Sequence, residues 1–236
     1  LTTVIKNLKT GDNGEALYNV GLMLFTETGG GNDNVRGTYI RSRLRAMDKA
    51  NSDDLAGLIA KLDTINDRGS NAQYAKAMHE AFQYYGGRDA LAGAGQLKRD
   101  CLAFIQPTGP SILGPFAKSF NLTCTPHRTT YFSPVSDGCQ KNFIMLISNG
   151  TTDNGENNEA QKLLTGVGGV NLKTDPLPLV PNNEAANWSD EYSRFLRGND
   201  FCDAARFGGT CNIAGPQDIT TITIAVYVNS EGNNAK

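Results

Sequence analysis

The stretch 141–153, KNFIMLISNGTTD, decides the fold that the sequence predicts. Its apolar run, 143–147, is short and unbroken, which is typical of a strand that is covered on both faces inside a parallel sheet. A polar cluster follows at once, and open α/β sheets bind their ligands at the carboxyl ends of such strands. We therefore expect the binding residues to lie in that cluster: Ser148, Asn149, Thr151 and Thr152.

Composition excludes several classes of protein. The chain has 236 residues, of which 39% are hydrophobic, enough for one large domain or two small ones. Its 22 Lys and Arg residues nearly balance its 24 Asp and Glu residues, so nothing indicates a nucleic-acid partner or a membrane surface. No apolar run approaches the length of a membrane span. The sequence opens at Leu1 in a helix-like pattern without a signal peptide, so we expect a piece of a longer protein.

Hydrophobic periodicity predicts a chain that mixes helices and strands. Strands are expected at 18–25 and 38–47, paired as a hairpin, and at 143–147 and 218–228. Helices are expected at 53–64, 72–85, 157–164 and 184–196. This order indicates one α/β layered domain spanning 1–236, with long insertions at about 87–135 and 166–183.

Three arginines, Arg41, Arg43 and Arg45, alternate along the second expected strand and therefore share one face. A basic ligand patch is one interpretation. We favour the other, a solvated edge strand that its charges protect from pairing with another chain. His79 lies on the helix expected at 72–85, where we expect a surface or packing residue and not a catalyst.

The five cysteines lie in or beside irregular segments rich in Pro and Gly: Cys101, Cys124, Cys139, Cys202 and Cys211. None belongs to a C-x-x-C pair, which weakens a zinc interpretation. Disulfides in such loops are typical of an oxidising compartment. We predict that Cys202 pairs with Cys211, and that two of Cys101, Cys124 and Cys139 are joined, with Cys124 to Cys139 the preferred pair. The odd count leaves one cysteine without a partner in this chain.

Five segments, in content and order, resemble a known family. They are YNVGLMLF at 18–25, AQYAKAMHEAFQYYGG at 72–87, SPVSDGCQKNFIMLISNGTT at 133–152, ANWSDEYSRFLRGNDF at 186–201 and ITTITIAVYV at 219–228. Together they resemble the von Willebrand factor A domain of the type IV pilus tip and biogenesis proteins, the PilY/PilC family. The CQKNF segment at 139–143 is the most specific part, and the Asn187-Trp188 pair also matches.

The resemblance implies a von Willebrand factor A-like (Rossmann-like) fold, with a mostly parallel sheet and helices on both faces. It implies a secreted, pilus-associated protein that works in adhesion or pilus biogenesis and is not an enzyme. The implied partners are pilus subunits (minor pilins) and a host or surface receptor, with a β-propeller of the same protein C-terminal to this segment. A first strand carrying an Asp-x-Ser-x-Ser metal loop would precede Leu1.

Many A domains hold a divalent cation with hard oxygen donors from Asp, Ser and Thr. The resemblance places Asn149 at the position of an Asp and Ala72 near the position of a Thr. Asn149 keeps an oxygen but loses the charge, and Ala72 supplies no donor. We therefore expect a degenerate metal site, with weak or no cation binding and no other cofactor. A working, metal-dependent (MIDAS-type) ligand site is the alternative.

An enzyme is the competing class. Ser148 directly follows the expected strand, where a hydrolase nucleophile would lie, and His79 and His127 are the only histidines. The nucleophile elbow Gly-x-Ser-x-Gly needs Gly at position 146, which is Leu146 here. A secreted hydrolase using Ser148 is therefore the less favoured alternative. A nucleotide-binding domain would need a Gly-x-Gly-x-x-Gly turn after its first strand, which is not found.

Overall fold

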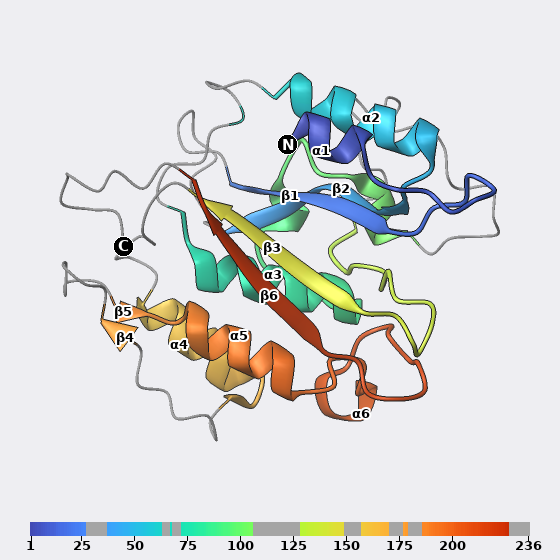
Figure 1. The fold of residues 1–236 in the computed structure, drawn as a ribbon. Helices are drawn as coiled ribbons and strands as arrows, with labels where there is room; N and C mark the ends of the chain where they lie inside the picture. The colour runs from blue at the N-terminus through green and yellow to red at the C-terminus, as the bar shows by residue number, and fades with distance from the viewer. Residues whose placement is uncertain are drawn as a thin grey trace.

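A computed structural model describes residues 1–26, 37–62, 67, 72–105, 128–148, 157–169, 177–178 and 186–226. Figure 1 shows the arrangement of the helices and strands. The helices are α1 (Thr2–Lys6), α2 (Lys49–Ala60), α3 (Tyr74–Gly86), α4 (Asn157–Gly166), α5 (Ser189–Gly198) and α6 (Ala204–Phe207), with two 3₁₀ turns, η1 (Gly93–Gly95) and η2 (Cys101–Phe104). The strands are β1 (Asn19–Phe25), β2 (Thr38–Ala46), β3 (Asn142–Ser148), β4 (Leu177–Pro178), β5 (Ala186–Asn187) and β6 (Ile219–Ala225).

The first two strands form the predicted hairpin. β1 pairs antiparallel with β2, and the register shifts on either side of Leu22, which marks a bulge. Gly21 lies so close to the bulged strand that a Cβ atom there would come within 3.0 Å of the Leu44 nitrogen. Only glycine fits against the backbone at that distance. The prediction of two paired strands at 18–25 and 38–47 is confirmed.

The stretch 141–153 begins with a strand of a second, parallel pair. β3 pairs with β6 from Asn142 opposite Ile219 to Ser148 opposite Ala225. The chain between them contains α4 and α5, because parallel neighbours need a crossover connection. β4 and β5 form a separate pair of two residues each. In the residues that the structure describes, the sheets are therefore small, and β3 has one neighbouring strand and not two.

Helix α3 contacts both strand pairs and organises the core. The Leu44 N–H of β2 donates to the Tyr84 hydroxyl at 2.9 Å, and the Tyr85 hydroxyl donates to the Phe143 carbonyl of β3 at 3.0 Å. The ring of Phe82 packs edge-on against Phe195 of α5, with centroids 5.4 Å apart. These contacts hold α3 and α5 together; Figure 1 shows α3 behind the parallel pair and α5 alongside β6.

The expectation that β3 is covered on both faces is wrong for the part of the chain that the structure describes. Leu146 is buried toward the helices, while Met145, its neighbour, is 56% exposed. Alternate residues of a strand point to opposite faces. Because α3 and α5 pack on one face, only the residues on that face are buried.

The disulfide prediction is half correct. Cys202 and Cys211 are joined, as expected from the short loop between them. Cys139 is a free, exposed thiol, so its predicted pairing with Cys124 is wrong. Cys101, left unpaired in that prediction, is disulfide-bonded; Cys124 lies outside the described residues. Among the helices that the structure describes, none is long and apolar enough to cross a membrane.

Candidate functional site

The carboxyl ends of two strands meet the start of α3 at the predicted ligand edge. Ser148 is the last residue of β3, and its carbonyl accepts the Val226 N–H at 2.8 Å. Its side-chain hydroxyl makes a hydrogen bond with the Tyr74 hydroxyl at the first turn of α3. The Tyr74 ring also lies 6.0 Å from the ring of Phe25 at the end of β1. Tyr74 therefore joins β1, β3 and α3 at one edge, a role that sequence reasoning missed.

The structure places only some of the predicted site residues. Ser148 lies at the edge, as predicted, while Asn149, Thr151 and Thr152 lie outside the described residues. Ala72 is half-buried against the main core cluster, two residues before α3 begins, and its methyl side chain offers no donor. The described side chains that meet at this edge thus include the two hydroxyls, which contact each other, and the ring of Phe25.

Charged residues on the neighbouring helices lie at both ends of the strands. Lys76 of α3 is nearly buried and forms an ion pair with Glu159 in the first turn of α4. Arg197, in the last turn of α5, pairs with Asp218 just before β6, so α5 runs antiparallel to β6. The first turn of α5, with Glu191, therefore points toward the carboxyl end of the sheet.

Glu191 is the most perturbed acid near this edge. Its side chain is buried, and burial, together with the neighbouring Asp190, raises its pKa from 4.5 to about 8. Burial and the neighbouring Asp190 therefore favour the protonated form of Glu191. Within the described residues, no three His, Cys, Asp or Glu side chains are grouped so that they could hold a metal ion.

His79 is a packing residue, as predicted. Its Nδ1 lies 3.2 Å from the Tyr192 hydroxyl of α5, and the two rings are perpendicular. Burial, and secondarily the charge of Arg88, lowers the pKa of His79 to about 4. The hydrogen-bond partner of His79 is Tyr192, and that of the Ser148 hydroxyl is Tyr74, so His79 does not form the serine–histidine contact that a Ser148 nucleophile would need. His127 lies outside the described residues.

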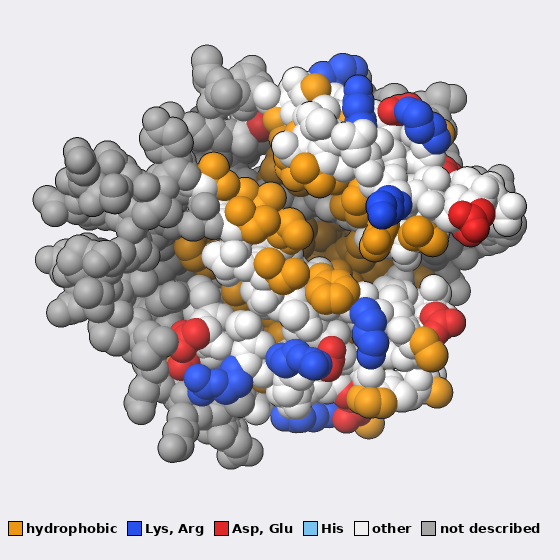
Figure 2. All heavy atoms as spheres, in the orientation of Figure 1, with side chains coloured by type: hydrophobic (Ala, Val, Ile, Leu, Met, Phe, Trp, Pro, Cys, Tyr) orange, Lys and Arg blue, Asp and Glu red, His pale blue; other side chains and the backbone are white. Residues whose placement is uncertain are grey.

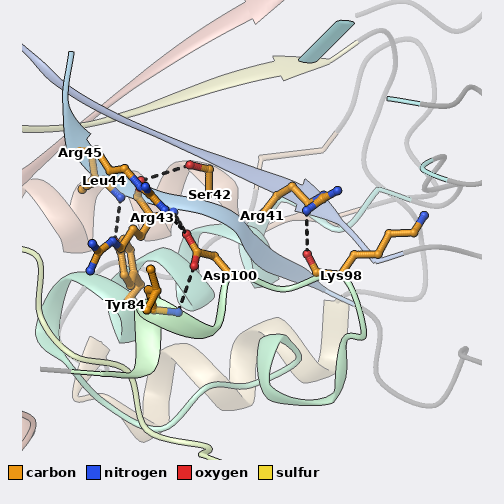
Figure 3. Close-up of polar contacts among 9 residues, drawn as sticks. Arg41, Ser42, Arg43, Leu44, Arg45, Tyr84, Lys98 and Asp100 are labelled. Carbon is orange, nitrogen blue, oxygen red and sulfur yellow. Dashed lines mark hydrogen bonds and ion pairs between the residues drawn. The ribbon is translucent and has the colours of Figure 1, made fainter. Parts of the chain in front are cut away.

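The prediction of a solvated, charged edge strand at β2 is wrong. Arg43 and Arg45 are buried, and Figure 3 shows them beside Asp100. One Asp100 oxygen accepts the Arg43 N–H at 2.9 Å and lies 3.4 Å from the Arg45 guanidinium. The Asp100 N–H donates to the Ile40 carbonyl at 2.8 Å. The segment around Asp100 therefore covers this edge of β2, and Arg43 and Arg45 are part of a buried network and not of an exposed ligand patch.

A second buried acid, Glu80 of α3, was also missed. Its carboxylate accepts the N–H groups of Leu91, Ala92 and Gly93, and the Tyr131 hydroxyl at 2.5 Å. Burial raises its pKa, and these hydrogen bonds act in the opposite direction. Glu80 thus ties the long insertion to α3. Its position in an amphipathic helix gives no signal of these long-range partners.

A cavity of about 780 Å³ lies at the other end of α3, away from the candidate edge. Phe82, Arg88, Arg206 and Phe207 contribute to its walls. The Arg88 guanidinium donates to the carbonyls of Phe82, Phe201 and Phe207, which leaves it committed to the fold. Arg88 is thus part of the framework of the cavity, which is distinct from the predicted ligand edge.

Comparison with known proteins does not identify a family for this chain. No protein-family model, no curated protein and no solved structure matches the chain.

Proposed function

We propose that the chain is a von Willebrand factor A-like module of a type IV pilus tip protein, and that it acts in adhesion and pilus biogenesis through protein contacts, without catalysis. The observation that carries this proposal is the edge at which Ser148, Tyr74 and Phe25 converge. It is the carboxyl edge of parallel strands, where α/β sheets bind ligands. The segment 133–152, which carries part of the family resemblance, contains the whole of β3 up to Ser148.

The strand edges support the A-domain part of the proposal. The Asp100 segment covers one edge of β2, and β1 covers the other. Among the described residues, β1 and β3 each pair with a single strand, and both lie over α3. One strand placed between β1 and β3 would join the two pairs into a single, mostly parallel sheet. The resemblance implies such a strand.

The contacts of Ser148 favour binding over hydrolysis. Its hydroxyl bonds to the Tyr74 hydroxyl and not to a histidine, which a serine nucleophile commonly uses as its general base. His79, the histidine that the structure describes, contacts Tyr192 instead. The Cys202–Cys211 disulfide is consistent with the proposed extracellular, pilus-associated location. Minor pilins and a surface receptor are the proposed partners.

Binding to purified type IV pili tests the proposal. Pili would be immobilised, and binding of the chain measured with and without EDTA. We expect binding that survives EDTA, because the donors proposed for recognition are backbone groups and the hydroxyls of Thr151 and Thr152. Replacing both by valine should abolish binding, while Thr3→Val, an exposed threonine of α1, should leave it unchanged. Absence of pilus binding, or equal binding by all three proteins, would argue against the proposal.

Calorimetry separates this function from its metal-dependent alternative. An amide at Asn149 supplies a dipole where a carboxylate would supply a full charge to Mg²⁺ or Ca²⁺. We expect no binding of Mg²⁺, Ca²⁺ or Mn²⁺ tighter than about 0.1 mM, the range of weak extracellular sites. Tighter binding that disappears in Asn149→Ala would show a working metal site, and EDTA would then also release the pili.

A further inference from the structure

The cavity at the C-terminal end of α3 has the size of a small-molecule pocket, at about 780 Å³. Segments that are distant in the sequence form its walls: the end of α3, the end of α4 with the residues that follow it, the end of α6 and the segment 209–210. Phe82, Val167 and Phe207 give it apolar walls, and Arg88 and Arg206 bring positive charge. Ligand pockets commonly combine apolar walls with a few polar groups in this way.

Arg88 is a buried cation without a carboxylate partner. The residue is only 7% exposed, and burial lowers its pKa to about 10. Its hydrogen bonds go to three backbone carbonyls, and no acid of the described part of the chain forms an ion pair with it. Buried charges are normally paired, and carbonyl dipoles offset only part of a full charge. The wall of the cavity is therefore electropositive at Arg88.

Arg206 adds a second positive charge on the exposed side of the cavity. Its guanidinium donates to the Asn199 side-chain oxygen at 2.8 Å and lies 4.6 Å from the centroid of the Phe207 ring. The Arg88 guanidinium lies 5.4 Å from the same centroid, so the two cations lie around one ring. Figure 2 shows Lys and Arg side chains gathered over α5 and α6, the helix that carries Arg206.

The other lining residues leave these charges uncompensated. Asp89 is the acid in the lining, and its carboxylate accepts the Thr130 hydroxyl at 2.5 Å. Neither Arg88 nor Arg206 forms an ion pair with it among the described residues. A Cβ atom at Gly168 would lie 3.4 Å from the Arg206 guanidinium, so a residue without a side chain leaves room beside this group.

We propose that this cavity binds a small organic anion. Its carboxylate or phosphate group contacts the remaining N–H groups of Arg206 and faces the charge of Arg88, and its apolar part packs on Phe207 and Val167. A guanidinium suits either anion, because its planar fork can donate two parallel N–H bonds. The anion supplies the counter-charge that Arg88 lacks within the protein. The proposal does not depend on the pilus function or on the edge at Ser148.

Nuclear magnetic resonance titration of the ¹⁵N-labelled chain tests the proposal. Inorganic phosphate and acetate, added in separate titrations, serve as probes of the anionic group. We expect the Arg206 side-chain Nε–H and the Gly168 amide to shift together and to saturate, with a dissociation constant on the order of 1 mM. Saturation by phosphate alone would identify the ligand as a phosphate compound, and saturation by acetate alone as a carboxylate.

Arg206→Gln should raise the dissociation constant at least about tenfold, because it removes the charge-assisted hydrogen bonds. Its amide can still donate to Asn199, and the side chain is exposed, so the variant should fold as the parent does. Arg88 is left unchanged, since it holds three carbonyls of the fold.

Lys61→Gln is the matched control, because it removes the same charge from an exposed residue at the end of α2, outside the cavity. It should bind both probes as the parent does, and the amide spectrum of each variant reports its fold. The absence of a saturable shift with either anion would overturn the proposal. Equal weakening by Arg206→Gln and Lys61→Gln would also overturn it, since it would show only a general attraction of anions to the surface.

Discussion

The two main strand pairs reverse what their sequences lead one to expect. β2 carries three arginines yet is almost entirely buried, whereas the nearly apolar β3 is exposed on one face. The Asp100 segment covers the free edge of β2, and α2 and α3 pack against the same strand. Helices pack on only one face of the β3–β6 pair among the described residues. The hydropathy of a strand therefore does not fix its burial, because the segments that pack around the strand determine which of its side chains are buried.

The comparison also shows how a charged strand can be buried. Asp100 supplies a carboxylate to the Arg45 guanidinium and accepts backbone N–H groups from Arg43 and Leu102. A buried charge is tolerated when it is paired and hydrogen-bonded. Burial, and secondarily the charge of Arg45, lowers the pKa of Arg43. The hairpin is thus held by this buried polar network as well as by apolar packing, whereas the inner face of the parallel pair packs mainly through apolar side chains.

The largest effect is expected at Asp100. Asp100→Ala leaves the buried Arg45 without this carboxylate and removes the acceptor of two backbone N–H groups. Breaking a buried pair in this way costs about 3–5 kcal/mol of unfolding free energy. Urea denaturation followed by the fluorescence of the single tryptophan, Trp188, measures it.

Asp53→Ala is the matched control. Asp53 also contacts a cation, Lys49 at 2.5 Å, but both side chains are exposed on α2. Exposed pairs contribute little, so we expect no measurable change. Equal stability of the Asp100 and Asp53 variants would show that the β2 network is not a buried one.

The second prediction compares neighbouring residues of β3. Leu146 belongs to the main core cluster, while Met145 points outward. Leu146→Ala should cost about 2–5 kcal/mol, through lost burial and the cavity left behind. Met145→Ala should cost less than about 1 kcal/mol. Equal losses would mean that the outer face of β3 is covered in the folded chain.

Local sequence patterns predicted which elements form better than where the helices begin: the helix expected at 53–64 is α2, which begins at Lys49, and the one expected at 184–196 is α5, which begins at Ser189 after β5. The hairpin, the strand at 143–147 and the last strand all follow from hydrophobic runs, and the helix expected at 72–85 is α3 within two residues of each bound. Burial could not be predicted in the same way. Whether β3 has one covered face or two depends on where α3 and α5 pack, and that is set by contacts between distant residues.

The candidate site was predictable only in its position. A polar residue after an apolar strand marks the carboxyl edge, which led to Ser148. The local pattern does not indicate that Tyr74 belongs to the site, because an apolar residue at the start of an amphipathic helix is expected to be a packing residue. Its hydroxyl reaches Ser148 across 74 residues of sequence. Asp100 was missed for the same reason, since its partners lie on β2, more than fifty residues earlier.

The third prediction concerns α5, which covers the inner face of the parallel pair. The pKa of Glu191 is raised by burial to about 8 from 4.5, so the folded chain binds this proton more tightly than the unfolded chain does. The resulting stabilisation is complete below about pH 4.5 and is lost as the pH rises toward 8. Glu191→Gln stays neutral at every pH. The melting temperature of this variant should therefore rise relative to that of the parent as the pH increases from 4.5 to 8.

Thermal melts of both proteins between pH 4.5 and 8.5 measure the difference. Glu80 and His79 are present in both proteins and cancel in this difference, whereas the neighbouring Asp190 interacts with Glu191 and contributes to the difference with it. The difference should grow with pH and level off above 8. A constant difference, or one that is largest in acid, would contradict the assignment of a protonated Glu191 to this helix.

The smallest expected effect tests the contact at the candidate edge itself. Tyr74→Phe and Ser148→Ala each remove one partner of the hydroxyl pair, at about 1 kcal/mol of unfolding free energy each. Because the two hydroxyls bond to each other, the double variant should lose less than the sum of the single losses, by about 0.5–1.5 kcal/mol. Tyr85→Phe is the matched control, since its hydroxyl bonds to the Phe143 carbonyl at the other end of β3. It should show no such coupling to Ser148→Ala. Additive losses for Tyr74 and Ser148 would mean that the edge is not held by this contact, and that the convergence of β1, β3 and α3 rests on the ring of Tyr74 alone.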